Sequence, residues 1–261
     1  MPTTAKLTFW DFGKQRELTV PLKTSPPRNP SEPYEKSLAN YMKEIDQLRD
    51  QDPSRHVYEI ANKYYGLSRI YDEFYDPDSR VNWEKYKRLE LAELQRGLTE
   101  ISKDDWIGWR RETWRKDGQY LGQKGADDNA IRTFHRQLRR QRLAETCAEA
   151  AEEAMSGDNL ATAEDFLTLA EEVGEPIFSD AKLGEQLLRR LSSAYRTKAH
   201  LIFSLTGDAE RSRVAWEKSQ RLRQEAAVLT GKTVSSNRFP FEPDENFQRT
   251  QKPKATSGSG R

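Results

Sequence analysis

The sequence has a single cysteine, three histidines and no long apolar run, and each shortage excludes a class of protein. One cysteine, Cys147, cannot form a disulfide within the chain, and residues 1–6 contain no apolar run like that of a secretory signal. We therefore expect a reducing, cytoplasmic location. No segment approaches the roughly 18 uninterrupted apolar residues that a membrane helix requires, so we expect no membrane partner.

The net charge is also small, because 43 Lys and Arg residues balance 42 Asp and Glu residues and leave a formal charge of +1. Such a chain has no overall attraction for nucleic acid or an acidic membrane, so binding of that kind depends on local patches. The charged fraction of 33% exceeds the usual value of about 25%. A composition of this kind is typical of exposed amphipathic helices, and 261 residues are enough for one large domain or two small ones.

Residues that perform catalysis or bind metals are sparse as well. His56, His135 and His200 are scattered, and none stands three residues after a glutamate, the spacing of helical carboxylate–histidine metal sites. The chain contains no Gly-x-Ser-x-Gly motif of the kind that presents a nucleophilic serine. We therefore expect no enzyme activity, no metal and no cofactor. Cys147 lies on an alanine-lined helix face, where a buried structural thiol is expected.

Hydrophobic periodicity divides the chain into five segments. Residues 1–23 alternate apolar and polar side chains about a turn near residues 13–16, which predicts a β-hairpin arm. Four prolines make residues 24–33 a linker, and the polar residues 230–261 are predicted to be disordered. Residues 34–116 and 127–229 are expected to form an N-terminal and a C-terminal helical subdomain. The predicted fold is an all-α multi-helix array or bundle preceded by the hairpin arm, whose apolar side would pack on the helices or on another chain.

Individual helices are predicted from Tyr34 onward, from Pro53 to Tyr75, and over residues 80–98, 103–116, 127–156, 159–173, 179–205 and 208–229. Asp76 and Pro77 are expected to stop the second of these. Within it, a helix-turn-helix elbow at Gly66 is the alternative to one continuous helix. We favour the continuous helix, because the apolar pattern runs through Gly66.

Residues 144–224 have small and aromatic side chains at the steps expected of paired helices. Around the second turn these are Phe203, Gly207, Asp208, Ser212, Trp216 and Ser219, and around the first they are Ala154, Gly157, Asp158, Ala163, Leu167, Ala170 and Pro176. In these residues the segment resembles the tetratricopeptide family of helical hairpins, with His200 at the family's first-helix glycine position. The two turn glycines are 50 residues apart, where the family has 34, so an additional helix is expected over about residues 178–192. The resemblance implies a partner-binding scaffold.

Charge is sorted along the chain into blocks of opposite sign. Residues 109–143 have a net charge of +6, residues 144–185 have −11 and residues 186–232 have +6. Glutamates crowd the end of the helix predicted over 127–156, where negative charge opposes the helix dipole unless a cation faces it. We expect that cation to come from Arg189, Arg190 and Arg196 or from a second molecule. The opposed blocks also predict self-association that depends on salt.

The strongest candidate binding site is a group of arginines beside tryptophans. It consists of Arg110, Arg111, Trp114, Arg115, Arg132, Arg136, Arg139 and Arg140. Guanidinium groups suit phosphates, and neighbouring aromatic rings suit base stacking. The alternative interpretation is structural: Trp106 and Trp109 would anchor the core, and the arginines would form a charge seam within the chain or between subunits. We favour the structural interpretation, because exposed mixed charge is the common case.

The tail contains three phenylalanines, Phe239, Phe241 and Phe247, in otherwise polar surroundings. They are either anchors for the groove of a partner or hydrophobic residues without a specific role. Taken together, these features predict a non-catalytic α-helical scaffold or adaptor subunit of a larger cytoplasmic complex, with other protein subunits or copies of itself as partners. The alternative is a nucleic-acid-binding subunit of an RNA or DNA complex, which would use the arginines for phosphates and the tryptophans for bases.

Overall fold

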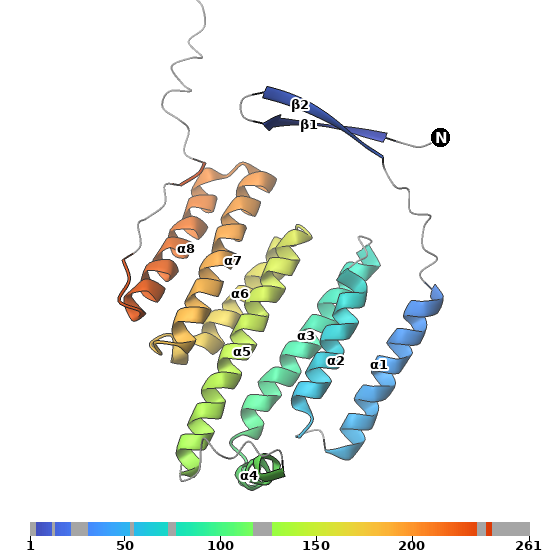
Figure 1. Ribbon diagram of the computed structural model, residues 1–261, viewed down its shortest axis with the longest axis vertical. Coiled ribbons are helices and arrows are strands. Elements are labelled where there is room, and N and C mark those ends of the chain that lie inside the picture. The colour runs from blue at the N-terminus through green and yellow to red at the C-terminus, as the bar shows by residue number, and fades with distance from the viewer. Residues whose placement is uncertain are drawn as a thin grey trace, which may run out of the picture.

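Most of the chain that can be described is helical. The structure is a computed structural model, and it describes residues 4–11, 14–21, 31–52, 55–72, 77–116, 127–233 and 239–241. Its α-helices are α1 (Ser31–Gln51), α2 (Val57–Asp72), α3 (Pro77–Glu100), α4 (Trp106–Lys116), α5 (Asp128–Ser156), α6 (Leu160–Gly174), α7 (Leu183–Thr206) and α8 (Ala209–Leu229) (Figure 1). The predicted all-α class is confirmed. Within the ranges given above, no helix combines the length and the apolar composition needed to span a bilayer.

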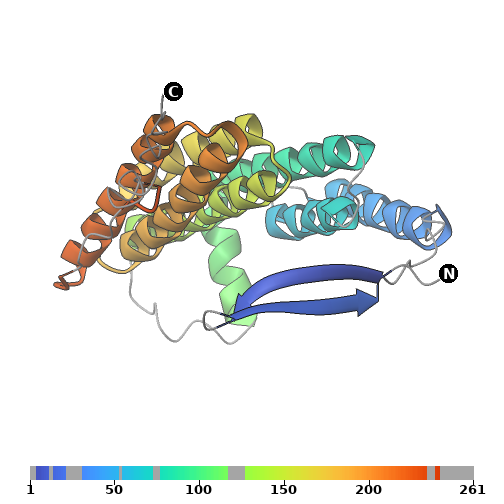
Figure 2. The same ribbon diagram turned by 90° about the horizontal axis from the view of Figure 1, so that it is seen from above.

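Two strands precede the helices. β1 (Thr4–Asp11) and β2 (Lys14–Pro21) pair antiparallel, with Leu7 opposite Leu18 and Asp11 opposite Lys14. The connection is shorter than the turn predicted over residues 13–16, because residues 14–16 belong to β2. In Figures 1 and 2 the strand pair lies outside the layers of helices.

Three antiparallel helix pairs lie side by side in the body of the molecule: α2 with α3, α5 with α6, and α7 with α8 (Figure 1). The first helix, α1, flanks α2 at one end of this array. The long helix α5 joins the pairs, because it packs against α3 on one side and against α7 on the other. The short helix α4 projects from the array (Figure 2).

Capping residues explain several of the helix ends. Asp127, Asn159 and Asp208 precede α5, α6 and α8, and the side chain of each accepts a hydrogen bond from the backbone N–H three residues later, at 2.8, 3.2 and 2.9 Å. Gly207 ends α7 in the left-handed conformation, with φ of 68°, which glycine adopts without steric cost. Pro77 begins α3, a position where its missing N–H sacrifices no helical hydrogen bond.

Helix α2 is continuous through Gly66, so the prediction of one helix instead of a helix-turn-helix elbow is confirmed. Glycine leaves room there for the Tyr41 side chain of α1. A β-carbon at position 66 would lie 2.8 Å from Cζ of Tyr41.

Three predicted boundaries are wrong. Helix α1 begins at Ser31, so Pro33 lies in its first turn and not in a linker. Proline is tolerated there because the first N–H groups of a helix have no helical acceptor. Helix α7 runs unbroken from Leu183, so the stretch 178–192 contains no separate helix before it. A β-carbon on Gly184 would lie 2.5 Å from the carbonyl oxygens of Ile177 and Phe178, which shows how tightly the preceding 3₁₀ turn, Glu175–Ile177, packs against the start of α7. The third concerns the predicted disordered tail, since residues 239–241 pack on α7 and α8; residues 234–238 and 242–261 lie outside the described residues.

The two predicted helical subdomains share one core. Ala61 of α2 and Trp83, Leu91 and Leu94 of α3 belong to the same buried apolar group as the alanine-rich face of α5 and the inner faces of α6, α7 and α8. A smaller group around Ile45 joins α1 to α2 and α3. Because a single core extends through both segments, the helical array is built as one body.

Candidate partner-binding surfaces

Two arginines of α5 bind the turn that follows α3. The Arg132 guanidinium donates hydrogen bonds to the carbonyl oxygens of Ile101, Lys103 (2.8 Å) and Asp104 (3.3 Å). Arg136 donates to Oγ of Ser102 at 3.1 Å. Carbonyl groups beyond the last helical turn lack helical donors and have partial negative charge. Arg132 and Arg136 therefore fix the turn over residues 101–105, which follows α3.

Two further arginines of α5 contact α2. Arg139 donates to the carbonyl oxygen of Gly97 and lies 5.0 Å from the centre of the Tyr58 ring. Arg142 lies 4.9 Å from the same ring and donates to Oδ1 of Asn62 at 3.1 Å. Burial lowers the pKa of Arg139 and raises the pKa of Tyr58. Such partly desolvated cation–π contacts are worth more than exposed ones, so they help to hold α2 against α5.

We call Arg132, Arg136, Arg139 and Arg142 the arginine seam, because they join α5 to α2 and α3. Three of them belong to the predicted phosphate-binding stripe, and their guanidinium groups contact this chain. Arg140 is the one stripe arginine for which the described part of the chain provides no hydrogen bond or ion pair.

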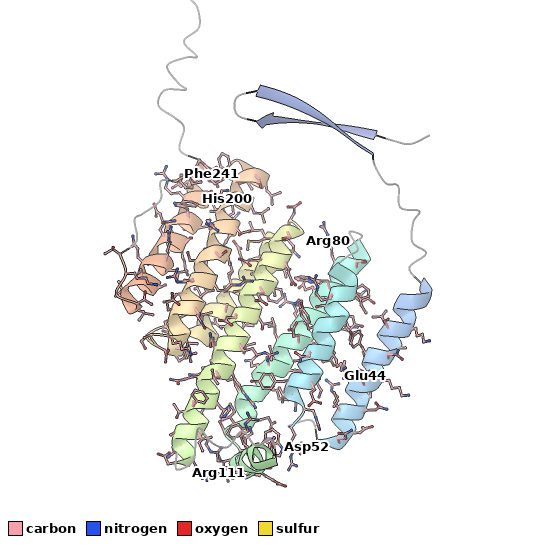
Figure 3. All side chains as sticks on the ribbon, viewed as in Figure 1. Glu44, Asp52, Arg80, Arg111, His200 and Phe241 are labelled. Atoms are coloured by element: carbon pink, nitrogen blue, oxygen red, sulfur yellow. The ribbon has the colours of Figure 1, made fainter. Side chains whose placement is uncertain are left out.

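The remaining predicted arginines lie on or near α4. Arg111 pairs with Asp128 at the start of α5, and Arg110 also interacts within the chain (Figure 3). Trp114 and Arg115 belong to the backbone of α4, but their side chains lie outside the described part of the structure. Trp106 is buried beside Ile101 and Ile131, as the structural interpretation expects. The described side chains of Trp106 and Arg111 thus make contacts within the fold.

The acidic block is balanced by cations of the same chain. The pairs are Arg190 with Glu149 (3.5 Å) and Glu152 (3.0 Å), Glu164 with Lys198 (3.0 Å) and Arg211 (3.3 Å), and Glu171 with Lys218 (2.6 Å). Hydrogen bonds from Lys198 and Arg211 outweigh desolvation and lower the pKa of Glu164. The prediction that Arg190 neutralises glutamates at the end of α5 is confirmed, because it forms ion pairs with two of them. The predicted salt-dependent self-association stays a prediction; the ion pairs show that part of the opposite charge meets within one molecule.

A buried charge cluster lies where α2, α3 and α5 meet. Lys87 is 1% exposed, and its Nζ lies 3.3 Å from Oε2 of Glu90 and 3.2 Å from Oε2 of Glu153. Nε1 of Trp83 donates to the same Glu153 oxygen at 3.3 Å, and the ring of Tyr65 lies 4.6 Å from the Lys87 ammonium. We call these five residues the Lys87 cluster. The sequence contained a signal that was missed: Lys87 stands four residues after Trp83 and four before Leu91, on the face of α3 that becomes buried.

An aromatic surface lies at the junction of α7 and α8, and residues 239–241 cover it. The ring of Phe241 stacks on that of Phe203, with centres 4.1 Å apart and planes at 12°. The ring of His200 meets it edge-on at 5.0 Å, and Figure 3 shows both residues at the same end of the array. Arg213 and Trp216 of α8 contact the ring of Phe239. We call these two residues, with His200 and Phe203 of α7, the aromatic site. Phe239 and Phe241, predicted as anchors for a partner, are thus seated on their own chain, and Phe247 lies outside the described residues.

Open hollows also lie on the surface of the described residues. One, of about 400 Å³, lies between α1 and α2 beside Glu44, Leu48 and Lys63. Another, of about 440 Å³, lies between α7 and α8 beside Leu188 and Val228. Among the residues that the structure describes, no three His, Cys, Asp or Glu side chains gather as a metal site would need. Cys147 is fully buried as expected, and burial raises the pKa of its thiol.

No protein-family model, no curated protein and no solved structure matches this chain. Its fold, its internal contacts and its exposed side chains are therefore the basis on which a function can be proposed.

Proposed function

We propose that this protein is a non-catalytic helical scaffold, an adaptor subunit of a larger cytoplasmic complex. Its partners would be other protein subunits or further copies of the chain. The observation that carries the proposal is the side-by-side stacking of three helix pairs on one shared core. Stacked helical pairs present long rigid faces, and such faces serve as extended protein-binding surfaces in helical-repeat proteins. In this proposal α5–α6 and α7–α8 act as tetratricopeptide-like hairpins, and β1–β2 acts as an arm.

The exposed cations of α7 are the best-placed contacts for such a partner. Arg189 and Arg196 are exposed on α7, whereas Lys198 of the same helix is used in an internal ion pair. Arg196 has no ion pair within the described part of the chain, and Arg189 pairs only with Glu185, one turn away. Exposed charges of this kind guide and orient a protein partner more than they add to its affinity. An acidic protein surface is therefore the expected counterpart.

The intrachain contacts of the arginine seam favour the adaptor over the nucleic-acid alternative. A phosphate backbone bound there would compete with the carbonyl groups that Arg132 and Arg139 already contact. Releasing those carbonyl groups would remove hydrogen bonds that hold α3 and the turn after it against α5. A subunit of an RNA or DNA complex would need other cations than these.

The test is affinity capture of the tagged full chain from its native host, with protein and nucleic-acid content both measured. We expect a defined protein partner that survives nuclease treatment. The double variant R189E/R196E should lose that partner, whereas R80E/R221E, with the same change in charge at other exposed positions, should retain it. Capture of nucleic acid alone, released steeply by salt, would contradict the proposal and favour the alternative.

A further inference from the structure

The segment Phe239–Pro240–Phe241 is held on the helical array by its two aromatic rings. Phe239 is 8% exposed; its ring lies 6.2 Å from that of Trp216 and 5.2 Å from the Arg213 guanidinium carbon. Phe241 contacts Phe203 and His200 as described above. Ring burial and a cation–π contact help to hold this segment on the helices.

The side chains that receive the segment are placed by the helices themselves. Ser212 of α8 donates a hydrogen bond to the carbonyl oxygen of Ala199 at 2.7 Å, next to His200. The edge of the His200 ring contacts Trp216 with centres 6.1 Å apart, without any help from the tail. The side chains of the aromatic site thus come from two helices that also contact each other directly.

The chemistry of this contact matches a known mode of peptide recognition. Proline fixes its own backbone torsion, which lowers the entropy lost when a short segment docks. Here Pro240 and Phe241 lie in a turn of the chain. Proline-containing segments are recognised by surfaces lined with aromatic rings, and here two rings flank the proline and enter such a surface. A tethered segment occupies its site at a high effective concentration, on the order of millimolar for a short flexible linker.

We propose that the aromatic site is a peptide-binding site for aromatic–proline–aromatic segments, and that Phe239–Pro240–Phe241 occupies it within the same chain as an autoinhibitory strap. A partner with a segment of this kind binds by displacing the strap. The inference extends the proposed adaptor function by a site of defined chemistry. Its test measures peptide binding alone, so failure here is distinguishable from failure of the adaptor proposal.

The experiment uses a fluorescent peptide with the sequence of residues 236–244 and the full-length chain, with binding followed by fluorescence anisotropy. The variant F239A/F241A, which vacates the site, should bind the peptide saturably. The unmodified chain should bind it at least about tenfold more weakly, because its own strap competes. F247A is the matched control and should behave like the unmodified chain. Adding Phe203→Ala to F239A/F241A should abolish binding, as should replacing both phenylalanines of the peptide by alanine.

Circular dichroism establishes that each variant is folded, and Phe241→Ala alone serves if the double variant is not. Absence of saturable binding to a folded variant would overturn the peptide site. Equal binding by the variant and the unmodified chain would overturn occupancy by the strap. A dimer of the unmodified chain in light scattering that F239A/F241A abolishes would show that the segment docks on a second copy, which would overturn occupancy within the chain.

Discussion

Ser192 of α7 and Ser219 of α8 donate hydrogen bonds to each other's backbone carbonyl oxygens, at 2.9 and 2.7 Å. Both side chains are buried, in an interface where small residues let the two helices approach closely. Their reciprocal bonds satisfy both hydroxyl groups, and so add to the α7–α8 contact without leaving a polar group unpaired.

The serine pair predicts a coupled loss of stability. Ser219→Ala should lower the free energy of unfolding by about 1 kcal/mol, because one buried hydrogen bond is lost. Ser219→Val should cost more, about 1–3 kcal/mol, because its added volume forces the helices apart. Urea unfolding followed by circular dichroism measures both. The double variant S192A/S219A should cost less than the sum of the single changes; strict additivity would show that the two hydroxyl groups do not act together.

Removal of the Lys87 ammonium should strongly destabilise the fold. Lys87→Met leaves the Glu90 and Glu153 carboxylates without their buried cation, which we expect to cost about 3–5 kcal/mol at pH 7. Lys85→Met, an exposed neighbour on α3, is the control and should change stability by less than about 0.5 kcal/mol. Urea unfolding of the two variants makes the comparison. Similar losses in both would show that the Lys87 cluster contributes no specific stability.

The buried carboxyl group of Glu90 should make the free energy of unfolding depend on pH. Burial raises the pKa of its carboxyl group above the usual 4.5. The folded state therefore holds this proton more tightly than the unfolded state, so the stability due to Glu90 is greatest in acid and is lost as pH rises through the folded-state pKa. Glu90→Gln should accordingly gain stability relative to the unmodified chain between pH 4 and pH 7. The exposed Glu172→Gln is the control; a difference for Glu90→Gln that stays constant or falls with pH would contradict this account.

His135 predicts a change of the opposite sign. Burial, with the nearby Arg110 and Arg139 cations, lowers the pKa of His135 to about 4. Its unfolded form takes up a proton at higher pH, so its contribution to stability is present above about pH 6.5 and is lost as pH falls toward 4. An NMR titration of the ring nitrogens measures this pKa directly. The His135 ring lies 5.4 Å from the Trp106 ring of α4, centre to centre. Titration near 6.5 would show that the ring is not buried at this contact.

The arginine seam predicts unequal effects within one stripe. Arg132→Ala should cost about 1–3 kcal/mol of folding free energy, because the carbonyl groups after α3 lose their donor. Arg140→Ala is the control, because Arg140 lies on the same helix and has no hydrogen bond or ion pair within the described part of the chain. This change should alter stability by less than about 0.5 kcal/mol. Urea unfolding measures the free energy of unfolding of both variants. Equal, small effects would mean that Arg132 is free to bind a phosphate.

Helix positions could be predicted from the sequence because they depend on local signals. Periodicity locates α5, and caps such as Asp127 and Asp208 mark where α5 and α8 begin. Pro33 and Pro77 were misread because proline is tolerated in the first turn of a helix, so it marks a beginning as well as an end.

The partners of side chains could not be predicted in the same way. Periodicity placed Arg132, Arg136 and Arg139 on one stripe, but their acceptors lie 28 to 42 residues away, several of them on the backbone. Composition gives no information on which carbonyl groups a fold leaves without donors. The docking of Phe239 and Phe241 was missed for a similar reason, since a polar tail shows no periodicity that would reveal a return to the core.

The central claim, that one rigid face of the helical array binds a protein partner, is tested most directly by hydrogen exchange of the captured complex compared with the free chain. We predict that exchange slows in α7 around Arg189 and Arg196 when the partner is bound, and that nuclease treatment leaves this protection unchanged. Protection limited to α4 and the start of α5, and lost on nuclease treatment, would contradict the claim and identify a nucleic-acid-binding protein.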